Sequence, residues 1–169
     1  MKKILKANKT SVILVTHDQE EAFSFADRLL IMNKGELVQS GVGRELYNGP
    51  KNSFVASFLG EANFLTRKEA FYFKSLDKEL VLEEEGKEEY ILRPHDIILK
   101  KAGKEQDISS LKGVIKETQY LGEMMSYKLL VKSDEQSERT LVVKNFFQDF
   151  FESEEEVSFR IHKISGVDS

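Results

Sequence analysis

The chain of 169 residues contains no cysteine. This excludes disulfide bonds and thiolate metal sites, and it is compatible with a reducing cytoplasm. No apolar run approaches the ~20 residues that a helix needs to cross a bilayer, and the first ten residues lack the apolar core of a signal peptide. Basic residues do not outnumber acidic ones, since the formal net charge is -4. We therefore expect no direct membrane insertion and no general attraction to nucleic acid.

Residues 11–27, SVILVTHDQEEAFSFAD, combine an apolar run, a polar turn and a helix start. Val12–Val15 is an unbroken aliphatic run, which predicts a strand that is covered on both faces and therefore parallel to its neighbours. His17 and Asp18 follow at its carboxyl end, the edge at which open α/β sheets bind ligands. Asp18 and Glu21 have capping-box spacing and predict a helix start. The helix has apolar residues at helical spacing and should pack against the sheet.

His17 is the candidate site residue of this stretch. An imidazole at the rim of a sheet can donate a hydrogen bond to an anionic oxygen or titrate near neutral pH. Alternatively, His17 only hydrogen-bonds its own turn, and the residues alone leave both interpretations open. We expect no metal site, because HDQEE is not an HExxH motif and neither His95 nor His162 lies four residues from another histidine.

Turn and helix signals continue to Gly60. Two short strands at 29–32 and 37–39, joined by Asn-Lys-Gly-Glu, predict a hairpin. A short helical turn at 44–47 should end at Gly49 and Pro50. Asn52 or Ser53 should cap another helix. For that helix we favour core packing over a partner surface as the role of one apolar face, namely Phe54, Val55, Phe58 and Leu59.

Beyond a boundary at 61–63 the pattern changes to short alternating segments separated by charged loops. We expect domains at 1–62 and 63–169, the second a small β sandwich or barrel. Alternation at Tyr127, Leu129 and Val131, and again at 157–161, indicates one buried face. The expected strands are 64–66, 70–73, 80–82, 90–92, 97–99, 113–121, 125–132, 140–143 and 157–161.

Two further clusters in this second part are interpreted as structural. The acidic turn at 83–89, EEEGKEE, lacks the fixed carboxylate spacing of a calcium loop and is expected to be solvated. Four phenylalanines stand at helical spacing and should pack the barrel floor or a second subunit, with the core favoured. These four are Phe146, Phe147, Phe150 and Phe151.

The stretch VILVTHDQEEAFSFADRLLIMNKGELVQSG closely resembles the switch-histidine region of ATP-binding subunits of ABC transporters, in the importer branch that serves maltose, polyamines, iron, sulfate or phosphonates. The resemblance continues through GRELYNGPKNSFVASFLGEANFL, so it covers about the first sixty-five residues. It implies that His17 is both a catalytic and a nucleotide-binding residue, contacting the γ-phosphate of ATP held between two subunits. We interpret Asp18 chiefly as the helix cap.

The resemblance also implies cofactors, partners and a location. The complete protein would use ATP and magnesium and would pair with a second ATPase subunit and with transmembrane permease subunits. It would be cytoplasmic and peripheral on the inner face of the cell membrane.

The chain departs from the family in what it lacks. It has no G-x-x-x-x-G-K-[ST] phosphate loop, no LSGGQ-like signature and no apolar strand ending in Asp-Glu that would hold magnesium. In the family these elements precede the strand that Val12–Val15 matches, so we expect the chain to begin after them. By itself it should neither hydrolyse ATP nor bind ATP tightly.

A weaker resemblance covers the second part. YILRPHDIIL, at 90–99, is similar to the RP-x-D segment of the oligobinding-like regulatory domain (TOBE) that follows the ATPase, and LKGVIKETQYLGEMMSYKLLV to its strand, LG turn and strand. Arg93, Pro94 and Asp96 match, while His95 stands where glutamate is common. The copy is short between Asn63 and Tyr90.

The predicted fold is thus an α/β fragment, the end of a nucleotide-binding domain, followed by a mostly β, OB-like small barrel or sandwich. The expected function is the C-terminal portion of an importer ATP-binding subunit. The alternative is a stand-alone OB-like module that binds an oxyanion or small ligand, although the expected Ser-Ala-Arg-Asn motif is not seen. A nucleic-acid reader would need a basic groove with exposed aromatics, and glutamates flank these strands instead.

Overall fold

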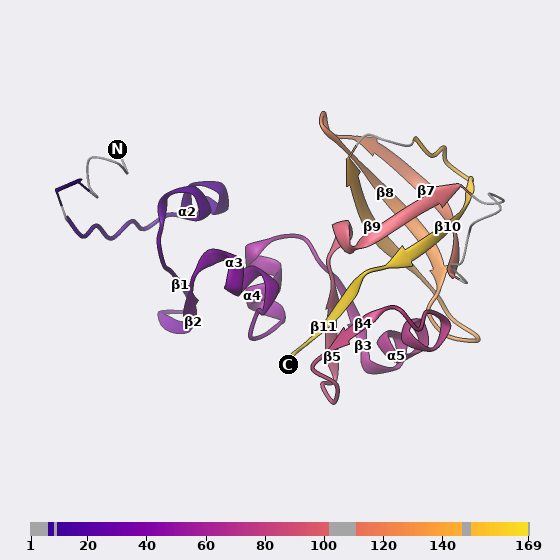
Figure 1. Cartoon of the computed structure of the whole chain (residues 1–169), viewed down its shortest axis with the longest axis horizontal. Helices are drawn as coiled ribbons and strands as arrows, with labels where there is room; N and C mark the ends of the chain where they lie inside the picture. The colour runs from indigo at the N-terminus through magenta and orange to yellow at the C-terminus, as the bar shows by residue number, and fades with distance from the viewer. Residues whose placement is uncertain (1–6, 9, 102–110, 147–149, 169) are drawn as a thin grey trace. The chain divides into compact units, whose positions relative to one another are not determined.

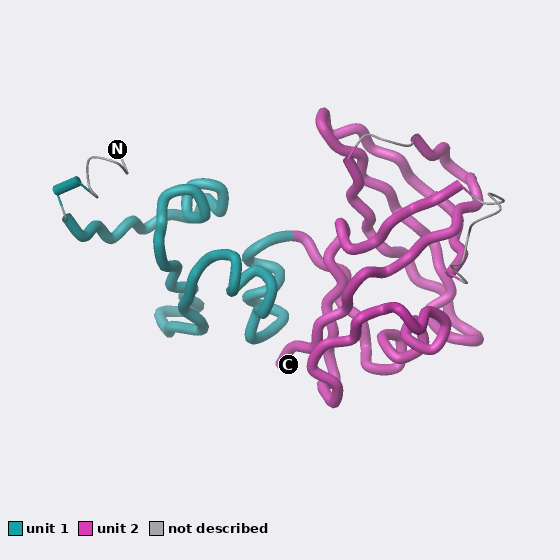
Figure 2. The backbone as a smooth tube through the Cα atoms, viewed as in Figure 1, with its two compact units in different colours: residues 1–60 teal, residues 61–169 magenta. Residues whose placement is uncertain are grey.

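The computed structural model describes residues 7, 8, 10–101, 111–146 and 150–168. The chain divides into two compact units, residues 1–60 and 61–169 (Figure 2). Unit 1 contains three short helices and one hairpin among its described residues (Figure 1). These elements are α2 (Gln19–Phe25), β1 (Leu29–Asn33), β2 (Glu36–Gly41), α3 (Gly43–Asn48) and α4 (Ser53–Leu59).

The predicted hairpin is confirmed. Strands β1 and β2 pair antiparallel, with Asn33 opposite Glu36, so the connecting loop has two residues. Those residues, Lys34 and Gly35, both have positive φ angles, of 49° and 84°. Positive φ at both central positions is the geometry that matches the right-handed twist of the flanking strands, and glycine adopts it without strain.

Unit 1 has a small core between the hairpin and the last two helices. Asn52 caps α4, because its side chain accepts a hydrogen bond from the Val55 amide at 3.0 Å. Phe58 is 39% exposed, so its predicted place in the core was wrong. It lies off the buried face of α4, stacked on the half-buried Phe54. The buried cluster consists of Ile31, Leu46, Val55 and Leu59.

The predicted strand at Val12–Val15 is not formed. All four side chains are exposed, Ile13 and Val15 to 93% each. A strand covered on both faces needs neighbouring strands for its backbone groups, and none of the described strands pairs with this segment. Helix α2 likewise buries none of its residues, so the expectation that it packs against a sheet was wrong for this structure.

Unit 2 is built on a five-stranded sheet in the order β6-β10-β7-β8-β9. Every neighbouring pair is antiparallel, and the sheet curls so that its edge strands β6 and β9 approach each other (Figure 1). This is the arrangement of a partly open, OB-like barrel, which confirms the predicted fold class. The strands are β6 (Ile97–Lys101), β7 (Leu111–Tyr120), β8 (Met124–Lys132), β9 (Glu138–Phe146) and β10 (Glu156–Ile161).

The alternating pattern correctly predicted the face that fills the barrel. Tyr127 on β8 and Phe159 on β10 are each only 1% exposed. Phe151 joins this core, edge-on to Tyr127 with ring centroids 5.7 Å apart. The helical spacing of the four phenylalanines was misleading, because Phe146 ends strand β9 and is 70% exposed. Phe147 lies outside the described residues.

A second, four-stranded sheet in the order β3-β5-β11-β4 carries helix α5. Residues 70–73 were predicted as a strand but lie in this helix, because Thr66 and Glu69 form a capping box that starts it. Strand β11 was not predicted, since Ser165 and Gly166 interrupt its apolar pattern. The elements are β3 (Asn63–Thr66), α5 (Arg67–Leu76), β4 (Val81–Glu83), β5 (Glu89–Leu92) and β11 (Lys163–Val167).

Asn63 joins the two sheets. Its side-chain amide donates to the carbonyl of Val142 at 2.8 Å and to that of Leu92 at 3.2 Å, while its oxygen accepts from the Val142 amide at 2.7 Å. Val142 lies on β9, an edge strand of the barrel. A buried side chain on β3 thus takes the place of a neighbouring strand for one residue of that edge.

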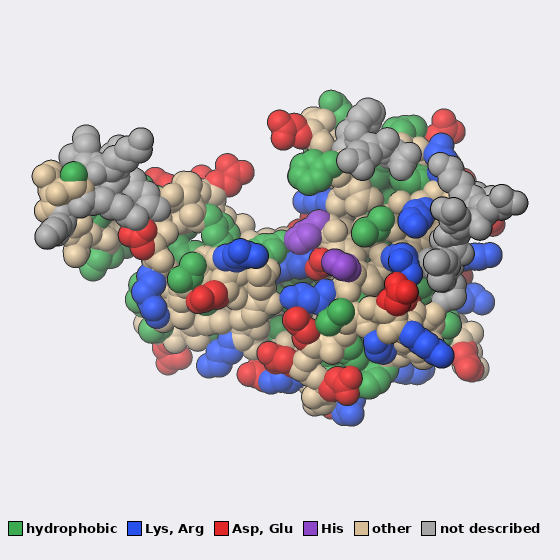
Figure 3. Space-filling model, in the orientation of Figure 1, with side chains coloured by type: hydrophobic (Ala, Val, Ile, Leu, Met, Phe, Trp, Pro, Cys, Tyr) green, Lys and Arg blue, Asp and Glu red, His purple; other side chains and the backbone are tan. Residues whose placement is uncertain are grey.

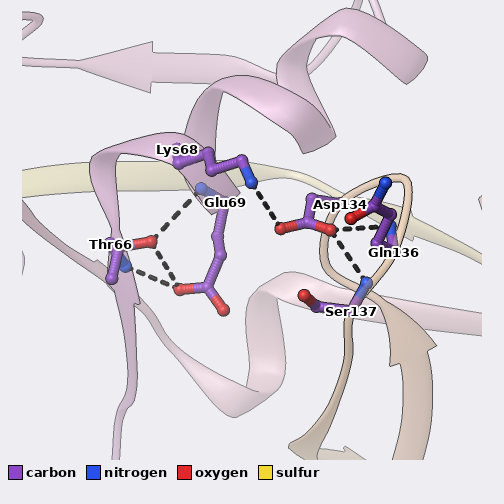
Figure 4. Close-up of polar contacts among 6 residues, drawn as sticks. All are labelled: Thr66, Lys68, Glu69, Asp134, Gln136 and Ser137. Carbon is purple, nitrogen blue, oxygen red and sulfur yellow. Dashed lines mark hydrogen bonds and ion pairs between the residues drawn. The ribbon is translucent and has the colours of Figure 1, made fainter.

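Charged side chains of α5 reinforce the same junction. Glu69, which completes the helix cap, also forms an ion pair with Arg139 of β9 at 2.7 Å, and both side chains are largely buried. Lys68 reaches Asp134 at 2.8 Å, and two backbone amides also donate to that carboxylate (Figure 4). The Lys68 ammonium and these amides hold the pKa of Asp134 well below its ordinary value.

We predict that Asn63→Ala destabilises unit 2 by about 2 kcal/mol, because it removes the partner of a buried carbonyl of Leu92 and of the partly buried amide and carbonyl of Val142. Urea unfolding followed by near-ultraviolet circular dichroism measures the effect. Asn48→Ala is the matched control, since Asn48 is exposed and lies in unit 1. Equal unfolding midpoints for the two variants would contradict the role given to Asn63.

Candidate functional site

The turn that carries His17 is built by its two neighbours. The Thr16 hydroxyl oxygen accepts from the Asp18 amide at 3.0 Å, and the Asp18 carboxylate accepts from the Glu21 amide at 3.0 Å. Asp18 is therefore the N-cap of α2, as its spacing to Glu21 predicted. Both polar neighbours serve the backbone of the turn.

The His17 side chain is exposed. It is not enclosed by unit 1, and the hydrogen bonds that form the turn come from the side chains on either side of it. An exposed imidazole at a capped helix start can donate to an anionic oxygen brought to it from outside the unit. The geometry supplies one exposed polar group at the start of α2.

Hydrophobic side chains are exposed at several places on unit 1 (Figure 3). Val12–Val15 leads directly into the turn that carries His17, and all four of its side chains are exposed. The hairpin also has an apolar outer face, because Leu30, Met32 and Leu37 are 65%, 57% and 55% exposed while the alternate residue Ile31 is buried. Contiguous exposed apolar residues of this kind mark a surface that packs against another polypeptide.

The segment RPHD forms the corner at which the chain leaves the small sheet and enters the barrel. Arg93 is buried and donates to the Glu61 carbonyl at 3.1 Å. Pro94–Asp96 forms the short 3-10 helix η1 between β5 and β6. The His162 amide, at the return crossing from β10 to β11, donates to the Asp96 carbonyl at 2.8 Å. His95 is exposed at this corner.

Burial raises the pKa of Asp96 above its ordinary value, against the opposing effect of nearby positive groups. These groups come from η1 and the strand ends packed against it, namely Arg93, His95, His162 and Lys163. The Asp96 carboxylate is half-buried at the crossing between the two sheets, where burial disfavours its charged form.

The structure gives no metal-binding role to the acidic residues. Within the described ranges, no group of three or more histidine, aspartate or glutamate side chains is arranged to hold a metal ion. Glu83 of the acidic turn instead bonds the Ser165 hydroxyl and the Lys163 ammonium, at 2.9 and 3.0 Å. In the part of the chain that the structure describes, no helix is long and apolar enough to cross a membrane.

The chain matches import ATP-binding proteins of bacteria. It is 35% identical to the spermidine/putrescine import ATP-binding protein PotA of Haemophilus ducreyi, over 81% of this chain and 40% of that protein. It is 38% identical to PotA of Borrelia garinii subsp. bavariensis, over 72% of this chain and 36% of the relative. The PotA of Clostridium novyi is 33% identical over 80% of this chain and 39% of its own length.

This chain is homologous to part of an ABC importer ATP-binding subunit. The resemblance to importer ATP-binding subunits that was inferred from the sequence is thereby confirmed. No protein-family model matches the chain. The chain spans about 40% of the length of the curated relatives it matches.

Sequence reasoning missed one residue beside the candidate site. Gln19 is the first residue of α2, and its side-chain amide donates to the Phe58 carbonyl near the end of α4. No sequence motif signals this bond, because its partner is a backbone atom thirty-nine residues away. The only available hint was spacing, since Gln19 lies four residues before Phe23 on the same side of the helix.

We predict that the chain self-associates through the exposed apolar segment, and that Ile13→Lys together with Val15→Lys reduces this association. Both side chains are 93% exposed, so the charges disturb no packing within the unit. Sedimentation velocity at increasing concentration measures the change. Thr10→Lys with Ser11→Lys adds the same charge to neighbouring exposed residues and should leave association intact. A parent chain that stays monomeric at high concentration would refute the prediction.

We predict that Asp96→Asn raises the free energy of unfolding of unit 2 at pH 7. Because folding raises the pKa of Asp96, the folded state keeps this proton to higher pH than the unfolded state does. Stability therefore falls as pH rises from the unfolded pKa of about 3.9 through the raised folded value. The gain in free energy of unfolding from Asp96→Asn should vanish at pH values below this range, where Asp96 is protonated in both states.

Asp134→Asn is the control for the sign of this effect. Folding lowers the pKa of the Asp134 carboxyl, so the charged carboxylate stabilises the folded state. Replacing it by the neutral amide should destabilise unit 2 at pH 7. Urea unfolding at several pH values compares both variants with the parent. Destabilisation of unit 2 at pH 7 by both substitutions would contradict the assignment for Asp96.

Proposed function

We propose that this chain is the C-terminal portion of an ABC importer ATP-binding subunit. In it, His17 contacts the terminal phosphate of ATP, and residues 63–169 form a TOBE-like regulatory domain. The observation that carries the proposal is the exposed His17 on a capped helix start, directly after an exposed apolar segment. In the relatives, about 60% of the length lies outside the match and is available to cover that segment.

The chemistry assigned to His17 is a single polar contact. Its imidazole can donate a hydrogen bond to a γ-phosphate oxygen, where negative charge is concentrated during phosphoryl transfer. The phosphate loop and the magnesium-holding carboxylate are absent from this sequence. ATP and magnesium therefore bind the complete protein, and His17 supplies one contact to a site whose other groups come from outside residues 1–169.

The apolar surface of unit 1 supports an assembly with further nucleotide-binding-domain polypeptide. Val12–Val15 has the composition of a strand buried on both faces, and the hairpin presents a second apolar face. Adding Val12–Val15 to a parallel sheet would satisfy its backbone and bury its side chains together. The same event would place His17 at the carboxyl edge of that sheet.

Unit 2 would act as the regulatory and pairing domain. Its OB-like barrel carries the RPHD corner between β5 and β6 and the LG turn between the paired strands β7 and β8, with Gly122 at a φ of 87°. We assign a second ATPase subunit and transmembrane permease subunits as partners, and a cytoplasmic position at the inner face of the membrane. The relatives are named for spermidine and putrescine import, so polyamines are the proposed transported solutes.

The deciding experiment joins this chain to the part of a relative that it does not match. The chain alone should show no micromolar affinity in a fluorescent ATP titration. Fusion of the unmatched part of the Haemophilus ducreyi relative ahead of Ser11 should restore ATP hydrolysis, and His17→Ala in that fusion should lower kcat by at least ~100-fold. Measured affinity in the chain alone, or a fully active His17→Ala fusion, would overturn the proposal.

His162→Ala is the matched control in the same fusion. His162 is also an exposed histidine, but it lies in unit 2 at the crossing from β10 to β11. Its substitution should leave kcat within about twofold, because the proposed phosphate contact belongs to His17 alone. A loss of activity as large as that of His17→Ala would show that the assay reports folding and not the contact.

A further inference from the structure

Helix α2 is held by contacts at two successive turns. At its first residue, the Gln19 side chain donates to the Phe58 carbonyl of α4. One turn later, the Phe23 ring packs edge-on to Tyr47 of α3, with centroids 6.4 Å apart. None of the residues of α2 is buried. Its position therefore depends more on these two contacts than the position of a helix packed in a core would.

Gly43 makes the second contact possible. A Cβ atom added at Gly43 would lie 2.7 Å from a Phe23 ring carbon, closer than such atoms approach. The ring therefore rests directly on the backbone at the start of α3. Gln19 and Phe23 are four residues apart and face the same side of α2, so both contacts fix one helix face.

His17 lies two residues before Gln19, within the turn that Thr16 and Asp18 close. A rigid turn on a fixed helix has one orientation, whereas the same turn on a loose helix samples many. Reaction groups misplaced by about 1 Å lose much of their effect. The contacts of α2 are therefore the means by which unit 1 can set the direction of the His17 ring.

We propose that Gln19, Phe23 and Gly43 are positioning residues for His17. They act through the placement of α2 on α3 and α4, and none of them touches a phosphate. The inference rests on the proposed function for its catalytic meaning, but the placement itself is a property of the chain alone. Because Phe58 lies two residues before the end of unit 1, the bond also links the His17 turn to the segment that enters unit 2.

The first test measures order at His17 in the full chain without nucleotide. Gln19→Glu keeps the size of the side chain and replaces its donor with a carboxylate, which repels the Phe58 carbonyl. We expect the backbone order parameter at His17 to fall from about 0.85 toward 0.6. Glu20→Gln, the opposite exchange at the next residue, is the matched control and should leave it unchanged.

Gly43→Ala tests the aromatic contact independently. Alanine favours the helical conformation of α3, so a general loss of structure is not expected, yet its Cβ must displace Phe23. Because the chain has no cysteine, spin labels at Ser24→Cys and Ser57→Cys report the spacing of α2 and α4 specifically. We expect this distance distribution to broaden in Gly43→Ala and in Gln19→Glu, and to stay narrow in Glu20→Gln.

The ATPase fusion separates this inference from the proposed function. There, Gln19→Glu should lower kcat about tenfold with the KM for ATP unchanged, because a misdirected His17 weakens a transition-state contact. A parent-like order parameter and distance distribution in both variants would overturn the inference, whatever the fusion does. A fusion that binds no ATP would overturn the proposed function while the two physical measurements still decide the placement of α2.

Discussion

The hydrogen bonds of the Asn63 side chain are the constraint on which unit 2 depends. An OB-like barrel with an open edge has unpaired backbone groups at that edge, and such groups favour pairing with other chains. Asn63 supplies both a donor and an acceptor to Val142 from the neighbouring sheet. The Glu69–Arg139 ion pair then fixes helix α5 over the same strand. The small sheet, the helix and the barrel are thus stabilised through one junction.

Local signals predicted most of this architecture. Capping residues marked the starts of α2 and α4, and alternation at Tyr127 and neighbouring positions identified the barrel face. The prediction was wrong where a local pattern fitted two structures. Residues 70–73 are apolar enough for a strand, but the capping box at Thr66 starts a helix there. Strand β11 was missed because Ser165 and Gly166 interrupt its apolar pattern, and the strands that it pairs with, β4 and β5, lie far away in the sequence.

The sequence was enough to predict the kind of candidate site, but not the structure that surrounds it. The residues around His17 indicated a helix start and a ligand-facing edge, and the helix start is confirmed. Whether Val12–Val15 forms a strand depends on neighbours, since a buried parallel strand has no stable pairing by itself. The Gln19 bond could not be read from the sequence, because a backbone carbonyl carries no residue signature. Local chemistry therefore identified the residue, while its surroundings depend on tertiary contacts.

The two units differ in how complete their cores are, and this difference bears on function. Unit 2 buries a continuous set of aromatic and aliphatic side chains from both sheets, whereas the buried cluster of unit 1 has four members. A unit with so small a core gains stability from whatever covers its apolar faces, and binding to the folded form alone shifts its equilibrium. Because the exposed apolar segment leads directly into His17, covering that segment and placing the imidazole are physically one event. Under the proposed function, the phosphate contact of His17 would form only when the surrounding domain is assembled, and the histidine would stay inactive until its partner groups are present.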